Sequence, residues 1–282
     1  DTHWDVVVDF ISFHPYDLIK RLEIFRGKAG QFIFISTASA YQKPIIDYLV
    51  TESTPLVNPI WPYSRDKIDC ELYLNRELRE NGFPVTIIRP SYTYGETVIP
   101  VSFNSWERPY TVIDRMRKGL PVIIPGDGTS LWQLTHNADF AKGLLGLFGH
   151  QGSIGHAFHI TTDEVLSWNQ IFEATAEAAG VDKLNAVHSA SDYIVACMPD
   201  AKGGLHGDKA GSVVLDNTKI KRFVPDFVAT RRYRDGIKRS IAYYDADPAR
   251  QKIDEAANAN WDQLIAAYQR GLDLARRQFT ND

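Results

Sequence analysis

The chain has 282 residues, of which 44% are hydrophobic and 23% charged, so it is long enough for one large or two modest globular domains. A net charge of −4 gives no basic footprint, so nucleic-acid binding is not favoured. No apolar run approaches the roughly eighteen residues of a membrane span. The two cysteines, Cys70 and Cys197, form no metal pattern, and low cysteine use is compatible with the cytoplasmic location that we expect.

Strand-like and helix-like segments alternate along the first part of the chain. Residues 5–11 are an apolar, valine-rich run, typical of a strand buried on both faces of a parallel sheet. Helical spacing follows at 15–25, and a second strand-like run at 31–35 precedes an irregular loop at 41–61. The next helix, 62–81, ends at an Asn-Gly pair, which is a good helix stop. We also expect strands at 84–89, 122–124 and 155–160, and helices at 111–118, 137–147, 168–179 and 261–279.

This alternation predicts a doubly wound, parallel-sheet α/β domain accompanied by a smaller α+β domain. We assign residues 1–97 and 138–160 to the first domain, and residues 98–137 and 161–282 to the second. Ligands bind at the carboxyl ends of the strands in such sheets, so polar residues that follow strands are the first candidates for a site.

One such arrangement involves the start of the helix at 62–81. There the spacing of Tyr63 and Lys67 puts the phenol and the ammonium one turn apart on the same helix face. A lysine at that distance favours the ionised phenol and lowers its pKa. The preceding strand runs into Ser36-Thr37-Ala38-Ser39, where a hydroxyl can hydrogen-bond the same substrate oxygen. Together these groups form a device that moves a proton on or off an alcohol while a hydride leaves or arrives.

The Tyr-x-x-x-Lys spacing alone also fits a packed aromatic followed by a solvated lysine. Its context favours the chemical interpretation, because a further strand follows and leads into Pro90-Ser-Tyr-Thr-Tyr-Gly95. At this point the chain resembles the extended short-chain dehydrogenase/reductase family, in its NAD-dependent epimerase/dehydratase branch. The resemblance extends from about Trp4 to at least Trp168. The matching segments are 5–9 (the family's fourth strand), 34–41 (its serine/threonine strand end), 89–95 (Arg-Pro, then Tyr-Gly), 126–128 (Gly-x-Gly) and 135–139 (His-Val-x-Asp).

The resemblance implies that the first domain is a nucleotide-binding, Rossmann-type domain, that the second binds substrate, and that NAD or NADP is the cofactor. It implies that Tyr63 is the general acid/base, that Thr37 is the catalytic hydroxyl, and that Lys67 lowers the Tyr63 pKa and holds the nicotinamide ribose. The cofactor side is expected to include Ser36, Pro90 and Ser91. The alternative for Ser36 is a strand-end cap, and the alternative for Pro90 is plain turn geometry. Substrate contacts are expected at Ser39, Tyr92, Tyr94 and Trp132, although the two tyrosines could instead pack across the domain junction.

This sequence has no counterpart of the family's opening strand, Gly-x-x-Gly-x-x-Gly turn and helix. In the family these elements approach the dinucleotide pyrophosphate. Gly27-Lys-Ala-Gly30 precedes a strand, and Gly203, Gly204 and Gly207 lie far downstream. The nucleotide domain thus lacks its first strands here, and we expect the native protein to carry roughly seventy more residues upstream.

Two departures from the family narrow the chemistry. Sugar 4,6-dehydratases have Asp-Glu after the Ser-Thr pair, whereas this chain has Ala38 and Ser39, so a dehydratase of that type is not expected. Nucleotide-sugar epimerases carry a diphosphate-binding arginine in the stretch that corresponds to residues 129–135, and this chain has no arginine there. A UDP- or dTDP-sugar substrate is therefore in doubt.

The leading hypothesis is therefore an NAD(P)-dependent oxidoreductase or epimerase that acts on a small hydroxyl-bearing molecule, of which a sugar is one example. The alternative is a non-catalytic binding or regulatory protein on the same scaffold, with an RNA or protein partner.

A homodimer through the Tyr-Lys helix is permitted by Ile68, Leu72 and Leu78. No metal is expected, because His156 and His159 lie on opposite faces of a strand. His206-Gly-Asp208 is interpreted as a surface turn.

Overall fold

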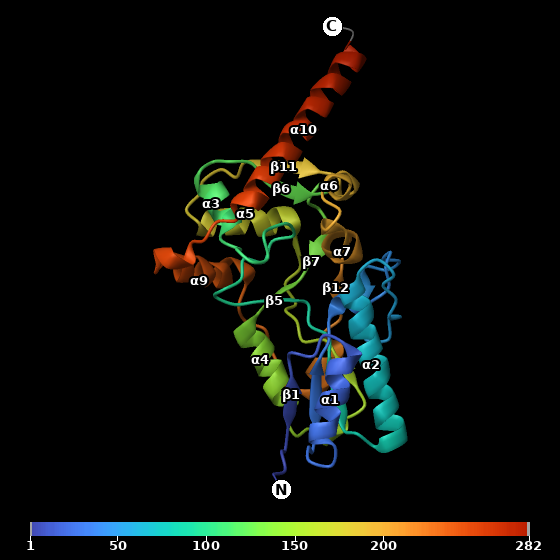
Figure 1. Cartoon of the computed structure of the whole chain (residues 1–282). Helices are drawn as coiled ribbons and strands as arrows, with labels where there is room; N and C mark the ends of the chain where they lie inside the picture. The colour runs from blue at the N-terminus through green and yellow to red at the C-terminus, as the bar shows by residue number, and fades with distance from the viewer. Residues whose placement is uncertain (1, 281–282) are drawn as a thin grey trace.

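Four short apolar runs form the central parallel sheet. They are β1 (Val7–Asp9), β2 (Phe32–Ile35), β4 (Val85–Ile88) and β9 (Ala157–Phe158), in the spatial order β1-β2-β4-β9. The side chains of β2 and β4 are almost all buried, as expected for strands covered on both faces. The predicted α/β class with a parallel sheet is therefore confirmed. The computed structural model describes residues 2–280, and Figure 1 shows this sheet in the lower of two lobes.

Helices cover both faces of the sheet. On one face α1 (Pro15–Phe25) and α2 (Pro62–Asn81) pack Leu18, Leu22 and Leu74 against Phe32 and Phe34. On the other face α4 (Asn137–Gly146) and α8 (Thr218–Phe223) form a cluster with Ile33, Ile88 and Phe158. The bounds of α1 and α2 are those expected from the sequence, because a proline starts each helix and Gly82, with φ of 66°, ends α2.

The upper lobe surrounds a second, larger core (Figure 1). Its parallel pair β6 (Val122–Pro125) and β11 (Ala186–Ser189) lies near α3 (Thr111–Arg117) and α5 (Trp168–Ala178), and α9 (Tyr233–Asp245) packs against α5. The final helix, α10 (Glu255–Thr280), packs against this lobe with its first half and projects away from it with its second half. The remaining elements are short: η1 (Ala38–Ala40), β3 (Leu49–Val50), β5 (Tyr92–Tyr94), β7 (Leu131–Trp132), β8 (Leu134–His136), η2 (Gln151–Ser153), β10 (Leu166–Ser167), α6 (Ser191–Cys197), α7 (Ala201–Gly204), η3 (Leu205–Lys209), β12 (Val214–Leu215) and η4 (Pro248–Arg250).

Residues 218–227 come from the C-terminal part of the chain, and their Ile220 and Phe227 complete the buried cluster on the lower sheet. The sequence interpretation of His206-Gly-Asp208 as a surface turn was wrong. This segment is one wide π-helical turn, η3, that continues from α7 and carries the buried Leu205 and Gly207.

Candidate functional site

The hydroxyl groups expected at the first strand end form a connected chain. Thr37 caps the short helix η1, its Oγ1 accepting a hydrogen bond from the Ser39 amide at 3.2 Å. Thr37 Oγ1 lies 3.0 Å from Ser39 Oγ, which in turn lies 2.8 Å from Ser64 Oγ at the start of α2. The Thr37 hydroxyl also interacts with the phenol of Tyr63, the residue before Ser64. The structure thus brings Thr37, Ser39 and Tyr63 together at the carboxyl end of β2.

Tyr63 occupies a partly apolar environment. Its ring lies 4.9 Å from that of Trp61 and 6.3 Å from that of Phe13, measured between ring centroids. Burial raises the pKa of Tyr63, whereas the hydrogen bond with Thr37 lowers it, since that bond stabilises the phenolate. Two further charges act on this pKa: Asp208 raises it and Lys209 lowers it.

Lys67 is held in a position that the sequence did not reveal. Its Nζ donates to the carbonyl oxygens of Ser12 and Ile35, each at 2.8 Å, and lies 4.7 Å from the centroid of the Phe34 ring. Asp9 orders the loop that supplies the first acceptor, because its carboxylate accepts from the amide and the hydroxyl of Ser12. Burial lowers the pKa of Lys67. One carbonyl acceptor follows β1 and the other ends β2, so the ammonium of Lys67 is directed toward the carboxyl ends of these two strands.

Ser36 belongs to a buried ionic network beside the catalytic candidates. Its hydroxyl donates to Glu71 Oε1 at 2.5 Å, and Glu71 forms an ion pair with Arg89 at 2.6 Å, with side-chain exposures of 1% and 7%. Arg89 also donates to the hydroxyl of Tyr41 at 2.9 Å, which contacts His159 Nε2 at 2.5 Å. This network ties the ends of β2, β4 and β9 to α2.

The loop after β4 lies alongside Thr37. The Pro90 carbonyl accepts from the Ala38 amide at 3.0 Å, so Pro90 is adjacent to the hydroxyl chain. Ser91 instead donates to the main-chain carbonyl of Gln133. Tyr92 is partly buried under Lys209, whose Nζ lies 5.2 Å from the centroid of its ring.

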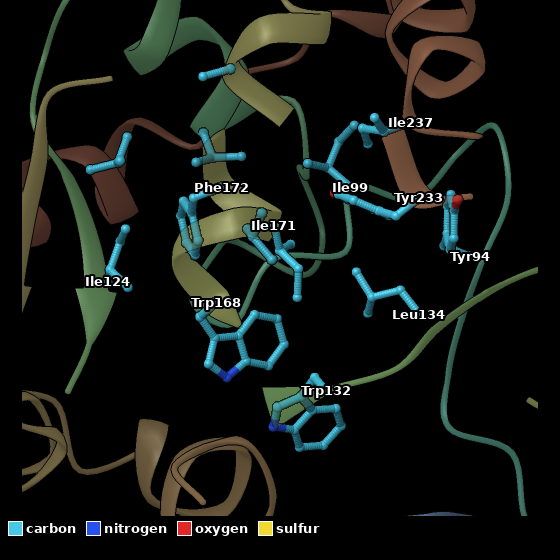
Figure 2. Close-up of a cluster of buried hydrophobic side chains, with 14 of the residues drawn as sticks. Tyr94, Ile99, Ile124, Trp132, Leu134, Trp168, Ile171, Phe172, Tyr233 and Ile237 are labelled. Atoms are coloured by element: carbon cyan, nitrogen blue, oxygen red, sulfur yellow. The ribbon is translucent and has the colours of Figure 1, made fainter. Parts of the chain in front are cut away.

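Tyr94 and Trp132, two of the expected substrate contacts, lie in the core of the upper lobe (Figure 2). Tyr94 is 1% exposed and packs edge-to-face on Tyr233 and on His136. Trp132 is 3% exposed, stacks on Trp168 with ring centroids 5.3 Å apart, and donates its indole N–H to the Gly211 carbonyl. These contacts leave both side chains little room for a ligand.

Asp208 and Lys209 are the charged residues near Tyr63 that the sequence interpretation missed. Glycine spacing was the available signal, since Gly203 and Gly207 are four residues apart and share one helix face. A Cβ at either position would lie within 3 Å of Trp61, so these glycines allow η3 to approach the start of α2 closely.

Within residues 2–280, no group of three or more His, Cys, Asp or Glu side chains is arranged to hold a metal ion. Over the same residues, no helix combines the length and the apolar character needed to cross a membrane.

The parallel sheet, with a Tyr-Lys helix at the carboxyl end of β2, defines a Rossmann-type α/β protein. A model of the NAD dependent epimerase/dehydratase family matches residues 15–161, more than half of the chain, and the protein therefore belongs to this family.

Curated relatives differ in their described activities. The chain is 28% identical over 185 residues to the chloroplast stem-loop binding protein of 41 kDa b from Arabidopsis thaliana, covering 66% of this chain and 45% of that protein. It is 26% identical over 222 residues to a dTDP-glucose 4,6-dehydratase from an Actinoplanes species, covering 79% of this chain and 62% of that protein. The matched part of the chain thus spans less than two thirds of the length of each of these relatives.

Among solved structures, the UDP-glucuronic acid 4-epimerase of Bacillus cereus in complex with UDP-glucuronic acid and NAD is similar, with a TM-score of 0.65 and 20% identity. The match covers 82% of this chain and 66% of that one. At this level of identity the similarity shows the fold.

Proposed function

We propose that this chain carries the acid/base half of an NAD(P)-dependent oxidoreductase or epimerase that acts on a small hydroxyl-bearing molecule. The observation that supports this most directly is the convergence of Thr37, Tyr63 and Lys67 at the carboxyl ends of parallel strands. Tyr63 accepts the proton of a substrate hydroxyl when the alcohol is oxidised, and donates it when a carbonyl is reduced. Thr37 supplies a hydrogen bond to the same oxygen and stabilises the phenolate.

In this proposal Lys67 holds the nicotinamide end of a dinucleotide. An ammonium has three donors, and Lys67 uses two of them on backbone carbonyls, which leaves one for a ribose hydroxyl and fixes its direction. Ser36, Pro90 and Ser91 are the further cofactor-side residues in this proposal. A bound nicotinamide supplies the acceptor or donor of the hydride.

The surface next to Lys67 also supports the idea that further structure completes the cofactor site. Among residues 2–280, β1 pairs only with β2, so its other edge offers free backbone groups. Large apolar side chains around this edge and on α1 are exposed to solvent: Trp4 (50%), Phe10 (53%), Ile11 (64%), Phe13 (45%), Tyr16 (62%), Ile19 (43%) and Ile24 (52%). An apolar surface of this kind is typical of a face that another segment covers.

Substitution of Tyr63 by Phe tests the proposed chemistry, because it removes only the phenolic oxygen. We expect turnover of alcohols or ketones with NAD(P) to fall by about 10²–10⁴-fold, with KM changed much less. Tyr48→Phe is the matched control, since Tyr48 is 56% exposed and outside the site. Full turnover by Tyr63→Phe would overturn the assignment.

A second candidate function rests on the similarity to the Arabidopsis stem-loop binding protein. In that case the chain binds structured RNA and the hydroxyl chain is retained without turnover. A labelled RNA stem-loop titrated at several salt concentrations distinguishes the two, since phosphate contacts by lysine and arginine make the affinity fall steeply with salt. Salt-dependent RNA binding without nicotinamide affinity would favour this candidate over the enzyme.

A further inference from the structure

The η3 turn carries a largely buried ion pair. Lys209 Nζ lies 2.8 Å from Asp208 Oδ2, and the two side chains are only 17% and 13% exposed. The backbone of the pair is fixed by two side chains: Trp168 donates its indole N–H to the Lys209 carbonyl at 3.1 Å, and Lys43 donates to the Asp208 carbonyl at 3.2 Å. The pair is therefore held in one place and is not a mobile surface group.

The same turn is fastened to the segment that carries the catalytic candidates. Asn58, which is 2% exposed, donates from Nδ2 to the carbonyl of Gly207 at 2.8 Å and to that of Ser39 at 2.7 Å. One amide thus connects η3 with the η1 turn that Thr37 caps. A π-helical turn is rare, and such turns occur frequently at functional sites.

Aromatic rings enclose the cation. Lys209 Nζ lies 5.2 Å from the ring centroid of Tyr92 and 5.9 Å from that of Trp61, which in turn packs on Tyr63. In such surroundings a charge acts on its neighbours over a longer range than it does in water.

The electrostatic coupling runs in both directions. Burial alone would lower the pKa of Lys209. Asp208 and the phenols of Tyr92 and Tyr63 together raise this pKa by more than burial lowers it, so Lys209 stays charged. Asp208 raises the pKa of Tyr63, whereas Lys209 lowers it. Thr37 acts on Tyr63 as a hydrogen-bond partner, and Lys67 donates to the carbonyls of Ser12 and Ile35.

We propose that the Asp208–Lys209 ion pair is a second electrostatic control of the Tyr63 phenol. It rests on the proposed function of Tyr63 as the acid/base group. Lys209 stabilises the phenolate, Asp208 stabilises the phenol, and both are positioning residues that act through Tyr63. Because Trp168 and Lys43 hold the backbone of the pair, the proton affinity of Tyr63 depends on how η3 packs against the start of α2.

A pH titration of the full chain labelled with ¹³C at tyrosine Cζ tests this without substrate or cofactor. The Tyr63 signal is assigned by its absence in Tyr63→Phe, and circular dichroism at each alkaline pH verifies that the chain stays folded. We expect Lys209→Met to raise the Tyr63 pKa and Asp208→Asn to lower it, each by on the order of half a unit. Lys209→Arg, which keeps the cation, should restore the wild-type titration. Lys202→Met, at an exposed position on α7, is the matched control and should leave it unchanged.

Shifts of opposite sign support the proposal, because a structural disturbance has no reason to follow the sign of the removed charge. Shifts of the same sign for Lys209→Met and Asp208→Asn, no shift, or an equal shift in Lys202→Met would overturn it. The outcome is separate from that of the proposed function. If Tyr63→Phe abolishes turnover while the titration is unchanged, Tyr63 is catalytic and the ion pair does not control it.

Discussion

The Glu71–Arg89 pair provides the sharpest stability prediction, because both side chains are almost fully buried and depend on each other. Glu71 accepts from Arg89 Nε at 3.0 Å, from Arg89 Nη2 at 2.6 Å and from Ser36 Oγ at 2.5 Å. Glu71→Leu leaves the guanidinium buried without its counter-charge, and such a change typically costs about 3–5 kcal/mol. Arg89→Met leaves the carboxylate in the same situation and should cost a similar amount.

The double variant Glu71→Leu/Arg89→Met removes both charges, so it should lose clearly less stability than the sum of the two single variants. Urea unfolding of the four proteins, followed by circular dichroism and by tryptophan fluorescence, gives the coupling energy. The exposed pair Arg234–Glu177, with side-chain exposures of 66% and 50%, is the control, and Arg234→Ala should cost at most about 1 kcal/mol. Additive losses, with a coupling below about 0.5 kcal/mol, would refute the reasoning.

Three further predictions concern other parts of the chain. Burial raises the pKa of Cys70 to about 12, whereas Cys197 is exposed. A maleimide should therefore label only Cys197 in the folded protein and both cysteines after denaturation. Labelling of Cys70 in the native state would contradict its burial. Burial lowers the pKa of His159, so the unfolded chain binds more protons and the free energy of unfolding should fall as the pH drops below about 6.5. His159→Gln should reduce that slope by up to about 1.4 kcal/mol per pH unit, and an unchanged slope would contradict the burial of His159. Gly203→Ala places a Cβ 2.3 Å from the Trp61 ring and should lower the free energy of unfolding in urea by about 1–3 kcal/mol. Gly204→Ala, whose Cβ has nothing within 4 Å, should be close to neutral. Equal effects of the two variants would contradict the close packing of Gly203 on Trp61.

The sequence was sufficient for the elements whose signals are local. Proline at the start and glycine after the end define α2, and the apolar runs of β2 and β4 define buried strands. The hydroxyl residues at the end of β2 and the Tyr-Lys helix could therefore be placed at one edge of the sheet.

Contacts between distant segments could not be predicted in this way. Strands of two or three residues, such as β5 and β12, form because tertiary packing brings their partners together. Tyr233 starts α9 fully buried, with its hydroxyl 2.7 Å from that of Thr175, although its neighbours Arg232 and Arg234 are exposed. Trp132 was expected to contact substrate, and nothing in its own segment reveals that Trp168 packs on it.

Binding of the nicotinamide coenzyme tests the central claim most directly. The measurement is a titration with NADH and NADPH, followed by nicotinamide fluorescence, of this chain and of a version extended upstream with the glycine-rich part of a family nucleotide domain. Lys67→Met in each background serves as the site-specific control. We expect saturable binding by the extended version, which Lys67→Met abolishes or weakens strongly, and weak binding at most by this chain alone. No binding by either version, or binding that is indifferent to Lys67, would contradict the account and favour the RNA-binding alternative.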